Sequence, residues 1–292
     1  MRNKKFVFAG NRFYVLEQML LRELNLVHIL AVRGSYLQRV LEQKGVEFTV
    51  VESKGQLIET IEATDFDYFV ANGCPYILPI TQLSTGEKKF VNVHPSALPD
   101  LRGADPVPGA LLHERDAGAT CHVMDDGIDT GGIIARVVIP NTPDLECGLL
   151  YQLSFLAEAE VFHAACERGF KVTTDNPSGG DTIYYTRREE DLEIDFDEPT
   201  SKIVARVRAW STRSQGARFH LGEHTFRVMA AEEVTNPYVM TRLNDYEENE
   251  VVFRYETSLL IRHGTAFLKL ASIEGDLSLV EPGQILSRPP AV

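Results

Sequence analysis

The sequence has no excess of positive charge. Its 29 lysines and arginines are outnumbered by 42 aspartates and glutamates, which gives a formal net charge of −13. Proteins that bind DNA or tRNA need a cationic surface to displace the counterions of the phosphate backbone. Nucleic acid is therefore not expected as a partner of this chain. The hydrophobic fraction of 44% favours a folded globular protein over a disordered one.

Cysteines are few and unclustered. Cys74, Cys121, Cys147 and Cys166 form no CxxC pair. This scatter argues against a zinc cluster or a disulfide framework and suits a reducing cytosol. No run reaches the roughly 20 apolar residues that a membrane-spanning helix requires, and the N-terminus lacks the apolar core of a signal peptide. We therefore expect a cytoplasmic protein that does not enter a membrane.

Glycine is scarce where a dinucleotide-binding loop would need it. Gly10 follows a predicted buried strand, but the next residues, Asn11 and Arg12, offer no second or third glycine of the nucleotide fingerprint. We therefore do not expect NAD binding, and Gly10 is interpreted as a tight strand-to-helix turn. Gly10, Asn11 and Arg12 remain candidates for contacting an anionic ligand, because backbone N–H groups are free at a helix N-terminus.

Strand and helix patterns alternate over the first part of the chain. Short links between them predict right-handed crossovers and a parallel, Rossmann-like α/β sheet. The apolar patterns predict strands at 5–10, 28–32, 48–51 and 68–71, and helices at 13–26, 36–43 and 57–63.

The predicted elements of the remaining chain change from mixed strand and helix to mostly strand beyond about residue 190. A further strand is predicted at 133–139 and long helices at 145–167 and 201–209, followed by short β-type runs at 217–220, 225–231, 250–255, 258–263 and 266–273. We therefore predict a catalytic domain over 1–190 with a mostly parallel sheet, and a smaller β-rich domain over 191–292. Exposed strand edges in the second domain favour a homodimer joined partly through residues 200–292.

The stretch from 90 to 134 carries the chemistry. A β-type run at 90–94 places Asn92 and His94 on one face, and Pro95 ends that run. A second β-type run at 119–124 leads into a loop, 125–132, with three carboxylates and three glycines. Open α/β sheets keep their sites where strands end, so we expect Asn92, His94 and Asp129 to converge.

These motifs, Asn92-x-His94-Pro95-Ser96 and Asp129-Thr130-Gly131-Gly132, resemble the folate-dependent formyltransferase family. The resemblance implies that Asn92, His94 and Asp129 are catalytic and that N10-formyltetrahydrofolate is the cosubstrate. It implies a folate site at Tyr76, Ile77, Leu78, Asp125, Asp126, Gly127 and Ile128. On the acceptor side the candidates are Gly10, Asn11, Arg12, Ser96, Arg102, Gly103 and Asp105. Ala104 departs from some aminosugar members, which carry a second arginine there.

The three side chains suit formyl transfer, in which a neutral amine attacks a formyl carbon through a tetrahedral oxyanion. Asn92 can donate an N–H to that oxygen, and one such donor is typically worth about 3 kcal/mol. His94 can relay the proton that the amine loses, and Asp129 can orient the imidazole and raise its pKa. His122 is expected to be a core or supporting residue. A metal site from His94, His122 and Asp129 is an alternative on residue type alone, but no HxxH or HExxH spacing accompanies it, and no metal is expected.

Three acceptors fit the resemblance: glycinamide ribonucleotide, methionyl-tRNA and a nucleotide-linked aminosugar. About 100 residues beyond a catalytic domain count against the first, and the acidic chain counts against the second. That leaves the aminosugar, and the family resemblance implies dTDP-4-amino-4,6-dideoxyglucose, made for a surface polysaccharide such as O-antigen, as the preferred acceptor, with the 3-amino isomer left open. The choice of nucleotide and ring position rests on the family and not on a residue of this sequence. Methionyl-tRNA formyltransferase is the alternative enzyme, and a non-catalytic folate- or nucleotide-binding regulator is the alternative of another class.

Overall fold

A computed structural model describes residues 1–292 except 2, 178, 213 and 288–292. The contacts within the chain divide it into two compact units. The first contains Met1–Pro106, Asp116–Pro140 and Gln152–Tyr185. The second contains Val107–Arg115, Asn141–Tyr151 and the chain from Thr186 onward. Three parts of the first 190 residues, at 107–115, 141–151 and 186–190, thus belong to the second unit, and the domain boundary drawn at 190 stays a prediction.

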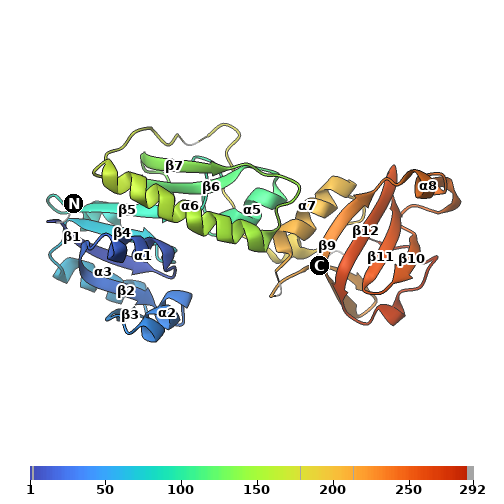
Figure 1. Ribbon diagram of the computed structural model, residues 1–292, viewed down its shortest axis with the longest axis horizontal. Helices are drawn as coiled ribbons and strands as arrows, with labels where there is room; N and C mark the ends of the chain where they lie inside the picture. Colours follow the sequence, from blue (N-terminus) through green and yellow to red (C-terminus); the bar gives the residue numbers. More distant parts are fainter. Residues whose placement is uncertain (2, 178, 213, 288–292) are drawn as a thin grey trace. The chain divides into compact units, whose positions relative to one another are not determined.

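The first unit is built on a seven-stranded sheet with the order β3-β2-β1-β4-β5-β6-β7 (Figure 1). Its strands are β1 (Lys5–Gly10), β2 (Asn25–Val32), β3 (Thr49–Val51), β4 (Tyr68–Asn72), β5 (Lys89–His94), β6 (Ala117–Val123) and β7 (Ile133–Ile139). Strands β1 to β5 pair in parallel, whereas β6 pairs antiparallel with β5 and β7 antiparallel with β6. The predicted α/β class with a mostly parallel sheet is confirmed.

Alternating side chains of the central strands explain why helices cover both faces of this sheet. Phe6 and Phe8 join a buried cluster with helices α1 (Tyr14–Leu21), α2 (Tyr36–Lys44) and α6 (Cys147–Glu167). Val7 and Ala9 point the other way, into a cluster with α3 (Lys54–Ala63) and α4 (Ile80–Leu83). A strand buried on both faces reads as a continuous apolar run, which is the pattern that predicted β1.

One local prediction was wrong, and one helix was missed. The helix predicted over 13–26 ends at Leu21, because Glu23 takes a φ of 53° that an α-helix does not allow, and β2 begins at Asn25. Helix α5 (Pro106–Leu112) was not predicted. Its sequence holds Pro108 and Gly109, which obscure helical periodicity.

The second unit carries a five-stranded antiparallel sheet with the order β10-β11-β12-β9-β8. The strands are β8 (Ala217–Leu221), β9 (His224–Val234), β10 (Val251–Tyr255), β11 (Ser258–His263) and β12 (Ala266–Glu274). Helix α7 (Thr200–Trp210) precedes them, and short helical turns are η1 (Glu189–Leu192), α8 (Pro237–Met240), η2 (Leu243–Asp245) and η3 (Leu277–Leu279). Each predicted β-type run of this region matches one of these strands, and only the run at 250–255 begins one residue before its strand, β10. Among the described residues, no helix is both long and apolar enough to cross a membrane.

Candidate active site

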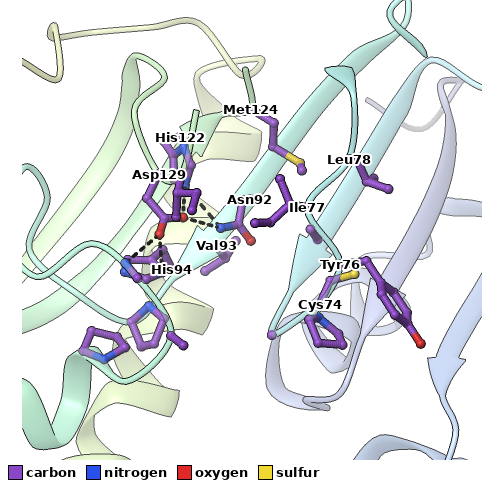
Figure 2. A pocket seen from close by; sticks show the side chains of 18 of the residues that line it. Cys74, Tyr76, Ile77, Leu78, Asn92, Val93, His94, His122, Met124 and Asp129 are labelled. Carbon is purple, nitrogen blue, oxygen red and sulfur yellow. Dashed lines mark hydrogen bonds and ion pairs between the residues drawn. The ribbon is translucent and has the colours of Figure 1, made fainter. Parts of the chain in front are cut away.

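A cavity of about 350 Å³ opens at the carboxyl ends of β1, β4 and β5. Asn11 and Arg12, after β1, line it together with Gly73, after β4, and with Asn92 and His94 of β5. The strand order reverses between β1 and β4, and the carboxyl edge at such a reversal is where open α/β sheets hold ligands. Figure 2 shows the cavity with Asn92, His94, His122 and Asp129 on one side and Tyr76, Ile77 and Leu78 on the other.

The structure brings the three predicted catalytic residues together. The Asn92 Nδ2 atom donates to Asp129 Oδ1 over 3.3 Å, and His94 Nδ1 lies 3.6 Å from Asp129 Oδ2. All three side chains line the cavity. An amide, an imidazole and a carboxylate therefore share one wall, which is the constellation expected from the strand ends.

Asp129 is held from several sides. Its backbone adopts a φ of 54°, in the left-handed region, and its carbonyl oxygen accepts from Arg102 Nε at 3.0 Å and Asn176 Nδ2 at 2.8 Å. The Gly103 N–H donates to Oδ2 at 3.1 Å. Burial by itself would raise the pKa of Asp129, but the adjacent His94 and the Gly103 N–H outweigh it and hold that pKa well below 3.8. The carboxylate is charged at neutral pH.

His94 is buried, with 6% of its surface exposed. Its Nε2 lies 3.1 Å from the Leu101 carbonyl oxygen, which only accepts, so Nε2 carries a proton and the neutral ring leaves Nδ1 bare beside Asp129. Burial lowers the pKa of His94, and the opposing effect of Asp129 does not restore it. The predicted effect of Asp129, which is to raise this pKa, is confirmed, but burial of the imidazole outweighs it and the pKa of His94 is lowered overall. A neutral imidazole can accept a proton, and the resulting charge would lie against the carboxylate.

His122 has a larger place in the site than its sequence suggested. It pairs with Asn92 across β5 and β6, and its Nε2 lies 3.2 Å from Asn92 Nδ2 and 3.5 Å from Asp129 Oδ1. It also lines the cavity. The pairing register of two antiparallel strands places it there, and periodicity within either strand alone does not reveal that register.

The predicted folate loops form much of the remaining lining. Tyr76, Ile77 and Leu78 line the cavity, as do Asp125, Gly127 and Ile128. Asp126 does not, because its carboxylate accepts from the backbone N–H of Thr81 at 3.0 Å and from the Thr81 hydroxyl. Those two hydrogen bonds lower the pKa of Asp126. Asp126 therefore fastens one loop to α4 and does not face the cavity.

On the acceptor side, Asn11, Arg12 and Gly103 line the cavity. The Arg12 guanidinium forms an ion pair with Glu158 of α6, whose side chain has no exposed surface. Gly103 has a φ of +107°, and a Cβ there would lie 2.4 Å from the Tyr185 carbonyl oxygen, so the position requires glycine. Gly10 pairs with Asn72 between the neighbouring strands β1 and β4 and does not line the cavity.

Three more predicted contact residues do not line the cavity: Ser96, Arg102 and Asp105. Ser96 is fully buried and donates to the Asp100 carbonyl oxygen at 2.9 Å. The buried Arg102 guanidinium donates to the Asn176 side chain at 2.8 Å and to the Pro177 carbonyl oxygen at 3.0 Å. Ser96 therefore stabilises the loop after β5, and Arg102 stabilises the segments around Asp129. Asn176, which accepts from Arg102, lies 74 residues away from it in the sequence, and no sequence motif indicated that it supports the site.

Within the described part of the chain, no group of three or more histidine, cysteine, aspartate or glutamate side chains is arranged to hold a metal ion. His94 and His122 each have a nitrogen within 3.6 Å of the Asp129 carboxylate, but the other nitrogen of each ring lies against a backbone carbonyl oxygen.

Comparison with known proteins places the chain. Residues 31–165 match the model of the formyl transferase family. The methionyl-tRNA formyltransferase of Novosphingobium aromaticivorans is 30% identical over 210 residues, which cover 69% of this chain and 69% of that protein. The chain belongs to the formyl transferase family. It spans between half and two thirds of the length of other curated methionyl-tRNA formyltransferases that it matches at 31–32% identity.

Two solved structures share the fold. An N-formyltransferase from Helicobacter canadensis, solved with folinic acid and dTDP-3-aminofucose, has a TM-score of 0.71 at 16% identity, covering 93% of this chain and 99% of that one. A 4-N formyltransferase from Francisella tularensis has a TM-score of 0.63 at 18% identity, covering 74% and 92%. At these identities the likeness concerns the fold, and the predicted family resemblance is confirmed by the family match.

Proposed function

We propose that this protein is an N-formyltransferase that moves the formyl group of N10-formyltetrahydrofolate to the amine of a nucleotide-linked amino-dideoxy sugar. The observation that carries the proposal is the meeting of Asn92, His94 and Asp129 on one wall of the cavity. A protein that only binds folate or nucleotide, the non-catalytic alternative, has no need for a bare imidazole nitrogen beside an ionised carboxylate.

The chemistry follows from the protonation states of these groups. The amine nitrogen attacks the formyl carbon, a C–N bond forms, and negative charge develops on the formyl oxygen, where an Asn92 N–H can stabilise it. His94 Nδ1 accepts the proton that the amine loses, and Asp129 stabilises the imidazolium. The bond from the formyl carbon to N10 then breaks, and His94 returns the proton to N10. The products are the formamide and tetrahydrofolate.

The folate side of the cavity is assigned to the Tyr76–Leu78 and Asp125–Ile128 loops. Ile77 is more than half exposed and Ile128 about a third exposed, so apolar surface is available for the flat pterin ring. Asn11, Arg12 and Gly103 line the same cavity and are our candidates for the acceptor. Arg12 meets an acceptor with its charge already balanced by Glu158.

Two considerations support a sugar nucleotide as acceptor. The net charge of −13 opposes the long-range approach of a polyanionic tRNA, whereas a sugar nucleotide brings only two phosphates. The fold also matches a protein solved with dTDP-3-aminofucose and a 4-N formyltransferase, both over most of their length. Our preferred acceptor is dTDP-4-amino-4,6-dideoxyglucose, and the 3-amino isomer is the closest competitor. A role in O-antigen or another surface polysaccharide would follow.

Methionyl-tRNA is the second candidate acceptor, favoured by the curated relatives of about 30% identity. The deciding experiment incubates the protein with N10-formyltetrahydrofolate and, in separate reactions, the 4-amino sugar nucleotide, its 3-amino isomer and methionyl-tRNA. Mass spectrometry then detects the gain of one formyl group. We expect a sugar nucleotide to be formylated and the tRNA to be left unchanged at physiological salt. Formylation of methionyl-tRNA alone would overturn the sugar proposal and leave formyl transfer intact.

The remaining predictions concern assembly and location. The second unit exposes Phe253 and Tyr255 on β10, as an interface strand would, and we propose a cytoplasmic homodimer joined partly through residues 200–292. Sedimentation of the full chain should give a dimer. A monomer at micromolar concentration would contradict this part of the proposal.

A further inference from the structure

We infer that His122 is a positioning residue that fixes the orientation of the Asn92 amide, and that the Asn92 N–H directed at His122 is the one that donates a hydrogen bond to the formyl oxygen as that oxygen gains negative charge. The inference rests on the proposed function. It assigns a role to a histidine that stands outside the Asn92, His94 and Asp129 trio, and it derives from the hydrogen-bond pattern of the cavity wall.

The hydrogen bonds of His122 determine its tautomer. Its Nδ1 lies 2.8 Å from the Val123 carbonyl oxygen, which can only accept. Nδ1 therefore carries a proton, and Nε2, which also lies 3.5 Å from Asp129 Oδ1, is the acceptor in that tautomer. Asn92 Nδ2 lies 3.2 Å from that Nε2, so one of the two amide N–H groups of Asn92 donates to His122.

The other N–H group of the Asn92 amide has a different acceptor. It donates to Asp129 Oδ1 over 3.3 Å. Since both neighbours of Nδ2 accept and neither donates, the amide has one favourable orientation, with nitrogen toward Asp129 and His122. Figure 2 shows the Asn92 oxygen on the opposite side of the amide, away from Asp129. Without His122, Asp129 alone would hold the amide.

The two hydrogen bonds of the Asn92 amide differ in strength. The bond to Asp129 is assisted by a full negative charge, because the pKa of Asp129 is held well below its usual value. The bond to His122 joins two neutral groups and is the weaker one. A formyl oxygen that gains negative charge competes best for the N–H held by His122. The wall thus keeps one donor oriented before the reaction and can release it to the oxyanion at little cost.

The inference can be tested with two substitutions that differ in one property. His122→Leu removes the acceptor and keeps a buried apolar volume, whereas His122→Gln offers a side-chain carbonyl oxygen in its place. Orientation of a transition-state donor affects kcat more than KM. We expect His122→Leu to lower kcat at least about ten-fold with little change in either KM, and His122→Gln to recover most of that loss. A matched control is His263→Leu, which removes a buried histidine of the second unit.

A second readout needs no substrate. The side-chain amide signal of Asn92, assigned in ¹⁵N spectra by its loss in Asn92→Ala, should exchange slowly with solvent in the wild type and in His122→Gln. It should exchange faster in His122→Leu. Equal kcat in folded wild type and His122→Leu, or equal loss in the Leu and Gln variants, would overturn the inference. Absence of formyl transfer by the wild type would instead defeat the proposed function, while the amide exchange would still test the positioning role.

Discussion

His94 and His263 are two buried histidines that make the same kind of contact through Nε2 but differ in what surrounds Nδ1. Both place Nε2 3.1 Å from a backbone carbonyl oxygen, of Leu101 and of Phe196 respectively. At His263, Nδ1 lies 2.8 Å from the Thr200 hydroxyl, which can donate to it. At His94, Nδ1 faces a carboxylate oxygen of Asp129 at 3.6 Å, in the wall of a cavity.

The difference separates a structural histidine from a reactive one. His263 has a complementary hydrogen-bond partner at each nitrogen, so its neutral form leaves no nitrogen available to accept a proton. His94 in its neutral form has a bare nitrogen facing an acceptor, and gaining a proton there would turn that contact into a charge-assisted hydrogen bond. Burial lowers the pKa of both histidines. Their surroundings, and not their burial or their pKa direction, therefore identify His94 as the reactive one.

The largest expected effect concerns the reactive site. Asn92→Ala, His94→Ala and Asp129→Ala should each lower kcat by at least ~10²-fold, because each removes a preorganised donor, a proton acceptor or the charge that stabilises it. Steady-state rates with the formyl donor and the preferred acceptor measure this, and circular dichroism checks the fold. A folded variant with near-wild-type turnover would remove that residue from the mechanism.

The structural histidine should show the reverse behaviour. His263→Leu leaves the Phe196 carbonyl oxygen and the Thr200 hydroxyl without their partner, which costs about 1–3 kcal/mol of unfolding free energy. Its kcat should stay close to that of the wild type. Denaturant unfolding and a rate assay on the same preparation check the pair of expectations. A large fall in kcat with unchanged stability would break the distinction between the two histidines.

The strands were predictable from the sequence because each is a short apolar run bounded by turn residues, as in Lys5–Gly10 and Ser258–His263. The meeting of Asn92 and His94 was predictable because they lie two residues apart on one strand. What could not be predicted depends on long-range partners. Glu158 balances the charge of Arg12, although the two residues are 146 positions apart in the sequence, and no residue near Arg12 indicates this ion pair. The sequence did not place His122 in the cavity wall, because its pairing with Asn92 depends on the register of two antiparallel strands, which no local pattern encodes.

A smaller effect should appear on acidification. Both histidines have folded pKa values below the unfolded value of 6.5, so below that pH the unfolded chain binds more protons than the folded one. The unfolding free energy should therefore fall as the pH drops below 6.5, and His263→Leu should reduce that fall. In kcat/KM, His94 should give an acid limb whose midpoint lies below pH 6.5. An acid limb centred well above pH 6.5 would contradict the buried neutral state of His94.

The smallest expected effect is that of metal removal. Proton transfer through His94 and charge stabilisation by Asn92 call for no metal, so overnight chelation should leave the rate unchanged. Loss of activity that zinc restores would contradict this expectation and would give His122 and His94 a role as ligands.

The central claim is that the wall formed by Asn92, His94 and Asp129 transfers a formyl group, and a labelled single-turnover reaction tests it most directly. Wild type and Asp129→Asn are each mixed with donor carrying a ¹³C formyl group and with dTDP-4-amino-4,6-dideoxyglucose. We predict that the wild type releases one tetrahydrofolate for each labelled formamide formed, and that Asp129→Asn does so at least ~10²-fold more slowly. Equal rates in the two proteins, or release of tetrahydrofolate with no label on the sugar, would contradict the account.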